Sequence, residues 1–401
     1  MDFALTTDQE RFRRDLRTWL ETTSLEVFGR VGLDPAGTSL LDVDDRQWER
    51  LLEYHRRLHR AGYVALHWPK EWGGAGAGPV EQAIYQDEVL RLGLPIYGAN
   101  QLAIDRIGPT LILMGSDEQR RRYLSPMLSG DEIWCQGYSE PNAGSDLASL
   151  TTRAVLEGDH FVVNGQKVWT SIANRAHYQV LLVRTDPAAP KHKGISYLLV
   201  DMRTPGITMR PLRQITGDAG FSEVFYDNVR VPRENLVGEL NGGWQVSIAT
   251  LMYERVSGGS RHPVAQMIDE LIALSTRAEF SGIPAAQHPY VRQKLAQFKI
   301  EAECLRLSRY RTITRQLRGA IPGPESSFGK LFATELNLRA AMFADELLGL
   351  DGNLAPDSPF VREDGRWLRR TLGARGYTVA AGTSEIQRNI IAERVLGLPK
   401  G

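Results

Sequence analysis

The sequence predicts a mixed α and β protein, mostly helical, in which a β domain separates two helical domains. The first observation is the helical spacing of apolar residues from Thr6 to about residue 130. The second is a set of short alternating apolar runs between about residues 132 and 238, each ended by turn residues. The third is the return of helical spacing from Gly242 onward. Because helices and strands are segregated, a Rossmann-type parallel sheet is not expected.

Length and composition favour a globular chain of several domains. Its 401 residues exceed what one compact core usually holds. We expect an N-terminal α-helical domain at 1–131, a middle antiparallel β domain at 132–238 and a C-terminal helical domain at 239–401. The formal net charge is +0, which argues against nucleic acid as a partner. The 2 cysteines are too few for a disulfide framework or a cysteine-rich metal site.

The first residues predict neither a secretory signal nor a membrane anchor. Charged side chains begin at Asp2, and no apolar core region follows them. No apolar run approaches the roughly 20 residues that a membrane-spanning helix needs. We therefore expect a cytoplasmic protein without a membrane span.

Local signals indicate where elements begin and turn. An amphipathic run follows Thr7, and Ser116 has the position of a helix cap. The stretch His160–Ser171 contains Asn164-Gly165 between two alternating apolar runs. This dipeptide is a strong hairpin signal, so a β-hairpin turn is expected there.

Three familiar motifs lack support. The glycines of GGAGAG at 73–78 follow a loop and do not have the spacing of a dinucleotide-binding turn. His55 and His59 have the helical spacing of metal ligands, but no acidic third ligand accompanies them, so a solvated helix face is expected. No nucleophile elbow and no P-loop occur, so neither serine hydrolysis nor phosphoryl transfer is indicated.

Two segments combine turn residues, hydroxyls and an aromatic ring. The loop WCQGYSEPNAGSDLASLTT, at 134–152, offers Ser139, Ser145 and several main-chain N–H groups. In KVWTS, Trp169 precedes two residues with hydroxyl groups. An aromatic ring beside two hydroxyls suits a flat heteroaromatic ligand that needs hydrogen bonds at its edge.

The third segment is TVAAGTSEIQRNIIAERVLG, at 378–397. Ser384 and Gln387 have the spacing of a capping box, so a helix is expected to begin near Ser384. The free N–H groups at a helix start favour an anion or a polar cofactor edge, and the alanines before the turn allow close approach.

These motifs, in this order, resemble the acyl-CoA dehydrogenase family. The similarity runs from the N-terminal helices through YSEPNAGSD, NGQKVWTS and EVFYDNVRVP to GTSEIQRNIIAERVLG, which covers essentially the whole chain. It implies a β-barrel-like middle domain and a C-terminal four-helix bundle. It also implies FAD held between these two domains, and a CoA thioester desaturated between its α and β carbons, as in fatty acid β-oxidation.

The resemblance also implies specific cofactor contacts. The 134–152 loop would contact the flavin and its phosphates, and the end of the KVWTS strand would pack against the isoalloxazine. An Arg-x-x-Phe pair would reach the FAD of a neighbouring subunit. The expected cofactor-binding residues are Gln136, Tyr138, Ser139, Gly144, Ser145, Trp169, Thr170, Ser171, Arg277, Phe280, Thr383 and Glu385.

The chemistry requires a base, because an α-proton must leave as the β-hydrogen is transferred as hydride. In many family members the base is a Glu directly before the Gly-Thr-Ser turn, where this chain has Ala381. The isovaleryl- and long-chain-type branch carries its base on a helix after the middle domain, and Glu254 stands at the matching position. Glu254 is therefore the expected catalytic base. The expected substrate-binding residues are Ser145, Arg255, Ala381 and Gly382.

One departure from the family pattern leaves the assembly open. The family often has a Gln-x-x-Gly-Gly segment that reaches FAD in the partner subunit, whereas this chain reads LLGLDGN, with Leu348 and Asp351 at the first and fourth positions. A homodimer or homotetramer is one reading. A subunit of a mixed oligomer, whose partner completes the flavin site, is the other.

Other functions on the same scaffold also stay open at this point. These are oxidation of a nitroalkane or of a carrier-protein-bound acyl group, and a DNA-associated member that works by binding. Electron-transferring flavoprotein is the electron acceptor that the resemblance implies.

Overall fold

The computed structural model describes residues 4–31, 33, 42–258, 264–319 and 323–400, without the side chains of residues 254–258. The chain divides into two compact units, and the division falls between Glu254 and Arg255. The first unit contains the N-terminal helices and the large β-sheet, and the second is helical. The domain boundaries expected from the sequence stay predictions.

The N-terminal helices begin where side-chain caps are available. Three of them, α1, α2 and α5, open with a capping box, formed by Thr6, Asp44 and Ser116 respectively. This confirms the cap expected at Ser116. The helices are α1 (Thr7–Phe28), α2 (Asp45–Arg60), α3 (Pro79–Arg91), α4 (Gly108–Met114) and α5 (Asp117–Ser129), with a π-helical turn η3 (Ala103–Ile107) before α4.

His55 lies in the core between these helices, so the solvated face expected for it is wrong. Its side chain is 0% exposed, and its ring nitrogens lie 3.0 Å from the carbonyl oxygens of Tyr97 and Leu128. Burial lowers the pKa of this imidazole. His55 therefore joins α2 to helix α5 and to the turn at Tyr97 as a packing residue. Among the described residues, no group of three or more His, Cys, Asp or Glu side chains is arranged to hold a metal ion.

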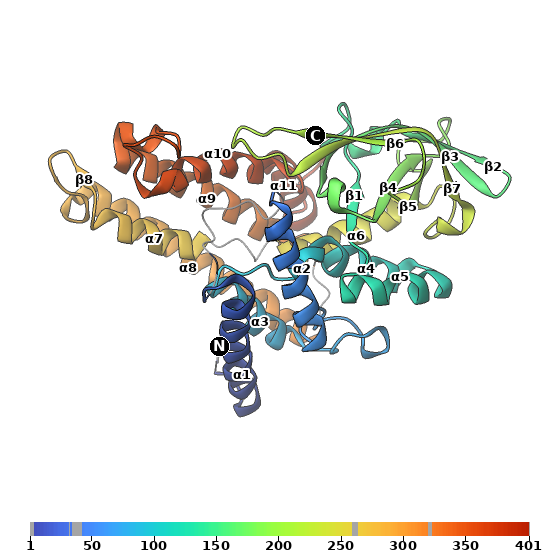
Figure 1. Cartoon of the computed structure of the whole chain (residues 1–401). Coiled ribbons are helices and arrows are strands. Elements are labelled where there is room, and N and C mark those ends of the chain that lie inside the picture. Colours follow the sequence, from blue (N-terminus) through green and yellow to red (C-terminus); the bar gives the residue numbers. More distant parts are fainter. Residues whose placement is uncertain (1–3, 32, 34–41, 259–263, 320–322, 401) are drawn as a thin grey trace. The chain divides into compact units, whose positions relative to one another are not determined.

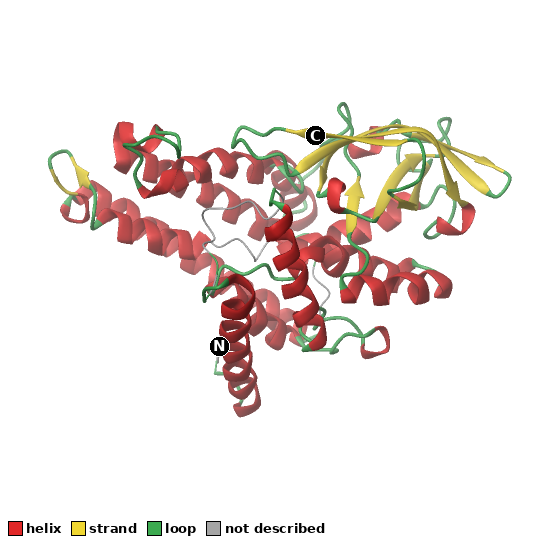
Figure 2. Cartoon of the chain, viewed as in Figure 1, coloured by secondary structure: helices red, strands yellow, loops and turns green. Residues whose placement is uncertain are grey.

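The middle of the chain forms one seven-stranded sheet, drawn in yellow in Figure 2. Its strand order is β1-β4-β2-β3-β7-β6, with β5 paired to β4. Pairing is mostly antiparallel, but β1 runs parallel to β4. The strands are β1 (Trp134–Gly137), β2 (Arg153–Glu157), β3 (His160–Ser171), β4 (Tyr178–Arg184), β5 (Ile195–Asp201), β6 (Ile207–Leu212) and β7 (Phe221–Pro232).

The hairpin expected at Asn164-Gly165 is wrong. Strand β3 continues through this dipeptide, and its pairing with β7 shifts register between Val163 and Gly165. Between these two pairs β3 has one residue, Asn164, and β7 has two, Asp227 and Asn228, so the extra residue of the β-bulge lies in β7, where Asn228 has φ 52°. The hairpin turn lies earlier, at Gly158-Asp159 between β2 and β3, where Gly158 has φ 63°.

The second unit is built around helix α9. This helix packs against α7, α8, α10 and α11, and α7 lies along α8 in Figure 1. A short pair of strands, β8 and β9, follows α7. The elements are α7 (Val264–Ser275), β8 (Glu279–Phe280), β9 (Ile283–Pro284), α8 (Pro289–Leu317), α9 (Ser326–Leu348), α10 (Arg366–Val379) and α11 (Ser384–Ile390), and α6 (Gly243–Gly258) precedes them. None of the helices within the described ranges is long and apolar enough to cross a membrane.

The close approach of Gly165 to Thr152 gives a stability prediction. A methyl group at Gly165 would lie 2.6 Å from the Thr152 hydroxyl and 2.7 Å from its Cα, whereas one at Gly158 would meet no atom within 4 Å. Both glycines have positive φ, so both alanine variants pay for backbone strain. We expect Gly165→Ala to be less stable than Gly158→Ala by about 1–3 kcal/mol, because only Gly165→Ala adds a clash. Thermal unfolding followed by circular dichroism measures this, and equal melting temperatures would contradict it.

Candidate functional site

In the first unit, the 134–152 loop and the end of strand β3 meet through main-chain contacts. The Val168 N–H donates to the carbonyl oxygen of Ser139 at 2.9 Å. The Lys167 ammonium donates to the carbonyl oxygen of Tyr138 at 2.9 Å. These bonds place Tyr138 and Ser139 beside the residues that lead into Trp169, so two of the three segments singled out in the sequence form one cluster.

Trp169 projects outward because the strand is irregular at this point. The pairing of β3 with β7 shifts register between Lys167 and Thr170, and Trp169 has φ 60°. A bulge turns the following side chains to other faces of a sheet. The indole is 58% exposed and meets the Phe221 ring edge-on, with 6.0 Å between the ring centroids. The structure thus presents a flat aromatic surface beside the loop.

Polar atoms without a protein partner lie near this surface. The Thr170 side chain is 0% exposed, and among the described residues its hydroxyl has no hydrogen-bond partner. The side-chain oxygen of Gln136, on β1, is likewise buried and unpaired. Because buried polar atoms are normally hydrogen-bonded, these two atoms are available to a bound ligand. A flat ring with polar edges fits the chemistry of an indole beside unpaired hydroxyl and amide oxygens.

The outer part of the loop is open. Gly144 and Ser145 are exposed, and a side chain built at Gly144 would meet no atom within 4 Å. Ser171 is half-buried at the end of β3. Space and hydroxyl groups are therefore available where the resemblance implies cofactor contacts, and the individual roles of these residues stay predictions.

A buried ion pair lies directly beneath the loop. Lys167 is 0% exposed and Glu140 is 6% exposed, and the ammonium lies 2.9 Å from the carboxylate oxygen Oε1. Burial opposes ionisation of Glu140, but Lys167 and hydrogen bonds from Thr151 and Thr152 outweigh it and lower its pKa to about 2. Burial lowers the pKa of Lys167 to about 8.

Helix α6 is anchored to the rest of the first unit at Thr250. The Thr250 hydroxyl lies 3.0 Å from the Thr110 hydroxyl on α4 and 3.3 Å from the Tyr197 hydroxyl on β5. Burial raises the pKa of Tyr197 to about 12, so the phenol stays neutral in the physiological range. Thr250 is four residues before Glu254, but the side chains of Glu254 and Arg255 lie outside the described residues. Their expected roles therefore stay predictions.

In the second unit, two buried side chains donate hydrogen bonds to the Ala381-Gly382 turn before α11. Lys330, on α9, is 7% exposed and donates to the carbonyl oxygen of Gly382 at 2.8 Å. Gln387 is 0% exposed and donates to the carbonyl oxygen of Ala381 at 2.9 Å. Both turn residues have positive φ, 55° for Ala381 and 87° for Gly382. Two consecutive residues of the turn therefore have positive φ, and buried side chains bind the carbonyl oxygens of both.

Helix α11 begins at Ser384 as expected, but the capping box expected at Ser384 and Gln387 is wrong. Thr383 caps the helix and accepts a hydrogen bond from the Ile386 N–H at 3.2 Å. The Ser384 hydroxyl instead donates to Glu335 at 2.6 Å. Glu385 is largely exposed and lies 3.5 Å from Arg388. The contact of Thr383 and Glu385 with a cofactor stays a prediction.

The residues expected to reach a neighbouring subunit are engaged within the second unit. Arg277 donates to the Glu363 carboxylate at 3.0 Å. Phe280 stacks on Tyr290, with 5.9 Å between the ring centroids. Asp351, at the position where the family has glycine, pairs with Arg362 at 2.8 Å.

Sequence reasoning missed the buried hydrogen-bonding role of four residues that shape these clusters: Glu140, Lys167, Lys330 and Gln387. One signal was available for Lys167. Residues two apart share a strand face, so the alternation that buries Phe161 and Val163 also directs Lys167 inward. A lysine at an inward position requires a partner, and that partner is Glu140. The others depend on contacts distant in sequence, which a local pattern does not show.

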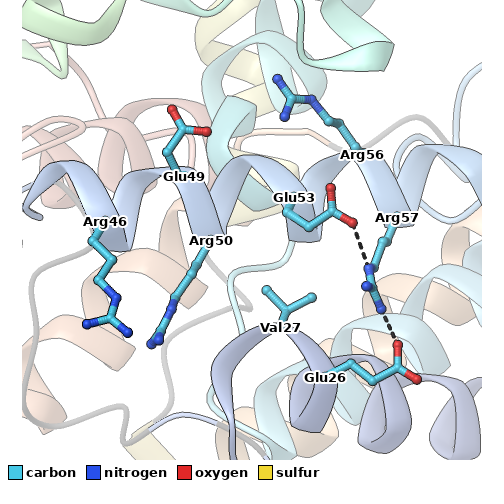
Figure 3. A pocket seen from close by; sticks show the side chains of 8 residues that line it. All are labelled: Glu26, Val27, Arg46, Glu49, Arg50, Glu53, Arg56 and Arg57. Atoms are coloured by element: carbon cyan, nitrogen blue, oxygen red, sulfur yellow. Dashed lines mark hydrogen bonds and ion pairs between the residues drawn. The ribbon is translucent and has the colours of Figure 1, made fainter.

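One further hollow lies between α1 and α2 and has a volume of about 450 Å³. In Figure 3, Arg57 lies between Glu53 and Glu26 and is joined to both by ion pairs. Arg57 lowers the pKa of Glu53 by hydrogen bonding. Its lining contains none of the residues expected from the sequence and consists of Glu26, Val27, Arg46, Glu49, Arg50, Glu53, Arg56 and Arg57. The charges are typical of a solvated groove, so we place the candidate site in the two clusters above.

Comparison with protein families gives three matches in chain order. Residues 38–131 match the description "Acyl-CoA dehydrogenase, N-terminal domain". Residues 135–229 match the middle domain, and residues 241–396 match the C-terminal domain, of the same family. Together these matches cover most of the chain.

Individual relatives are similar over the full length. The acyl-CoA dehydrogenase IpdE1 of Mycobacterium tuberculosis is 37% identical over 396 residues, which is 98% of each chain. The crystal structure of the ChsE4-ChsE5 complex from the same organism is similar at 35% identity and a TM-score of 0.83, with 100% of each chain covered. A structure titled "Tcur3481-Tcur3483 steroid ACAD" is 33% identical, with the same TM-score of 0.83 and 100% coverage of both chains.

The Glu140–Lys167 pair predicts how stability depends on acid. The pKa of Glu140 is about 2 in the folded chain, below its ordinary value of 4.5. The folded chain therefore binds fewer protons than the unfolded chain in this range, so stabilisation is present above about pH 4.5 and lost as the pH falls through about 2. It amounts to at most about 3 kcal/mol. We expect the gap in melting temperature between wild type and Glu140→Gln to narrow below about pH 4.5. A gap that stays constant from neutral to acid pH would contradict the assignment.

Proposed function

We propose that this chain takes part in the α,β-dehydrogenation of a CoA thioester. The chain belongs to the acyl-CoA dehydrogenase family of FAD-dependent oxidoreductases, and the proposal starts from that membership. Within this proposal, Glu254 is the base that removes the α-proton. The main-chain N–H of Ala381 donates a hydrogen bond to the thioester oxygen as negative charge develops there. When bound, FAD would supply the acceptor for the β-hydrogen, which leaves as a hydride, and Trp169 and Thr170 would hold its ring.

The observation that carries the proposal is the pairing of an exposed indole with a buried, unpaired hydroxyl at the end of β3. Trp169 offers a flat surface, and Thr170 offers a hydrogen bond that no described protein atom uses. An isoalloxazine ring needs both. The position of Ala381 supports the assignment of Glu254, because alanine cannot act as the base at the position used by many family members.

For the substrate, we propose a bulky, steroid-type acyl-CoA. Support comes from the relative titled a steroid acyl-CoA dehydrogenase, which is similar over the full length of both chains. The position of Glu254 is also the one used in the branch that acts on branched and bulky acyl groups. Straight-chain fatty acid β-oxidation is the less favoured alternative, and electron-transferring flavoprotein is the proposed electron acceptor.

For the assembly, we propose a mixed oligomer in which a partner chain completes the flavin site. Arg277 and Asp351, at positions where the resemblance implies contact with a neighbour's FAD, are here engaged in ion pairs with Glu363 and Arg362 respectively. A relative of similar length was solved as the ChsE4-ChsE5 complex, which supports the same reading. A homo-oligomer is the alternative that the experiments below separate.

The first prediction from the proposed function concerns the catalytic base. Anaerobic addition of steroid-type acyl-CoAs to the FAD-loaded protein should bleach the flavin absorbance in wild type. In Glu254→Gln, bleaching should slow by about 10²-fold or more, because a positioned general base typically contributes about that factor. FAD should stay bound. The exposed Glu239 just before α6 provides a matched control, and Glu239→Gln should bleach like wild type. Equal bleaching in Glu254→Gln and wild type would rule Glu254 out.

The second prediction concerns Thr170. Thr170→Val removes a hydroxyl that has no described protein partner, so the melting temperature of the FAD-free protein should not fall. The affinity for FAD should fall by about tenfold, which is the usual cost of one buried hydrogen bond. Thr170→Ser keeps the hydroxyl and should retain most of the affinity. Titration of the FAD-free protein, followed by quenching of flavin fluorescence, measures both, and unchanged affinity in Thr170→Val would contradict the placement.

The third prediction concerns stoichiometry. The chain purified alone should carry clearly less than one FAD per subunit, and co-expression with a complementary chain of the same family should raise FAD retention and turnover together. The measurement is the ratio of flavin absorbance to protein, combined with the mass of the assembly in solution. One FAD per subunit and full turnover in the lone chain would establish the homo-oligomer instead.

A further inference from the structure

We propose that the buried ion pair of Glu140 and Lys167, with the donors Thr151 and Thr152, is a clasp that holds the 138–152 loop in the shape that receives FAD. We call these four residues the loop clasp. The inference rests on the proposed function, because it takes the loop to be a cofactor-binding segment. Glu140 and Lys167 are positioning residues in this proposal, since they act through the loop backbone and are not expected to touch the cofactor.

The Glu140 carboxylate closes the loop by binding both of its ends. Glu140 itself lies at the N-terminal end of the loop, and its carboxylate accepts three hydrogen bonds from the C-terminal end. The donors are the Thr151 N–H at 2.7 Å, the Thr151 hydroxyl at 2.8 Å and the Thr152 N–H at 2.8 Å. Within the loop, Glu140 and Ala143 exchange main-chain hydrogen bonds of 3.1 and 3.0 Å, which form a tight turn at its start. Residues 140–152 are therefore tied into a closed loop at a single carboxylate.

Lys167 joins this closed loop to the strand that carries Trp169. Its ammonium donates to the Glu140 carboxylate and to the Tyr138 carbonyl oxygen, both at 2.9 Å. The next residue, Val168, donates its N–H to the carbonyl oxygen of Ser139 at 2.9 Å. Two consecutive strand residues therefore hold two consecutive loop residues. The distance between the loop and the indole is set by these bonds.

The burial of the pair favours a positioning role over a stabilising one. Both charged groups are almost fully removed from water, and a buried ion pair is often no more stabilising than apolar residues of similar volume. Residues 144–146 of the loop are exposed, and their described anchor is the half-exposed Asp146–Lys191 pair, while Arg184 donates to the carbonyl oxygens of Ala148 and Leu150 nearer the second end. Directed charged hydrogen bonds fix the orientation of a main-chain segment, which apolar packing does not. The clasp therefore prepares the loop before the cofactor binds.

Four variants separate positioning from stability. Lys167→Met and Glu140→Gln each leave one buried group without its charged partner and should lower the melting temperature. The double variant Glu140→Gln with Lys167→Met removes both charges and should recover most of that loss. The matched control is Lys191→Met, since Lys191 pairs with Asp146 of the same loop but is half-exposed. An exposed pair contributes little, so this control should behave like wild type.

The decisive measurement is the affinity for FAD, compared with the melting temperature of the FAD-free protein. The assembly used is the one that carries FAD in wild type. We expect the double variant to recover its melting temperature while its FAD dissociation constant stays about tenfold or more above wild type, because both Lys167 hydrogen bonds are missing and the Gln amide oxygen replaces only one of the two carboxylate oxygens. The absorption bands of any bound flavin should also shift. An FAD dissociation constant within about twofold of wild type in the double variant would overturn the proposal.

A milder variant keeps the test decisive if the double variant does not fold. Thr151→Val removes only the hydroxyl bond to Glu140, and Thr151 is exposed, so the fold should be retained. FAD affinity should fall by a few-fold with little change in melting temperature. Wild-type affinity in Thr151→Val would then count against the clasp. Failure of the clasp is distinct from failure of the proposed function, because the latter appears as a wild-type flavin that no acyl-CoA bleaches.

Discussion

The pairing of β3 with β7 is interrupted between Lys167 and Thr170, and the geometry of the first cluster depends on that interruption. In a regular strand, Lys167 and Trp169 would lie on the same face, because side chains alternate. The irregular register and the positive φ of Trp169 place the lysine in the core and the indole in solvent. Thr170 then returns to the interior. One local distortion thus produces a buried charge, an exposed ring and a buried hydroxyl in four consecutive positions, which a regular sheet does not allow.

Both clusters also rely on a buried lysine that donates to a main-chain carbonyl oxygen. Lys167 reaches Tyr138 in the first unit, and Lys330 reaches Gly382 in the second. An ammonium group on a long side chain can form a strong hydrogen bond to a loop from the buried side of that loop. The solvent-facing side of the loop stays free for a ligand. This arrangement suits segments that must be rigid and still present their N–H groups to a ligand.

The second unit departs from the family pattern at Asp351, in a segment that the resemblance places near another subunit. Arg277 and Asp351 each have an intrachain partner, and Glu363 and Asp364 both adopt positive φ before Gly365. Non-glycine residues in this conformation carry a cost of about 1–3 kcal/mol each and persist where the surroundings hold them. The ion pairs of Arg277 and Arg366 with Glu363 are such surroundings. This region is therefore organised for its own contacts, which is the physical basis for proposing a dissimilar partner chain.

The sequence by itself determined the class of the fold, the position of the β domain between helical regions and the family. Those features follow from apolar periodicity, which is a local property, and from motifs long enough to exclude chance. It also located the start of α11 and the cap at Ser116. The hairpin turn expected at Asn164-Gly165 is wrong because β3 pairs with β7 on both sides of this dipeptide, and a pairing with a strand some 60 residues away is not visible in the local sequence.

Tertiary structure alone decided which polar residues enter the core. His55 and Lys330 resemble surface residues in the sequence, since a side chain's burial depends on partners far away along the chain, and for Lys167 the strand pattern indicates an inward position but not the partner. Glu140 lies 27 residues from Lys167, and Lys330 lies 52 residues from Gly382. A buried charge is tolerated only when such a partner is present, so its site is set where distant segments meet. Local sequence patterns contain no information about that meeting point.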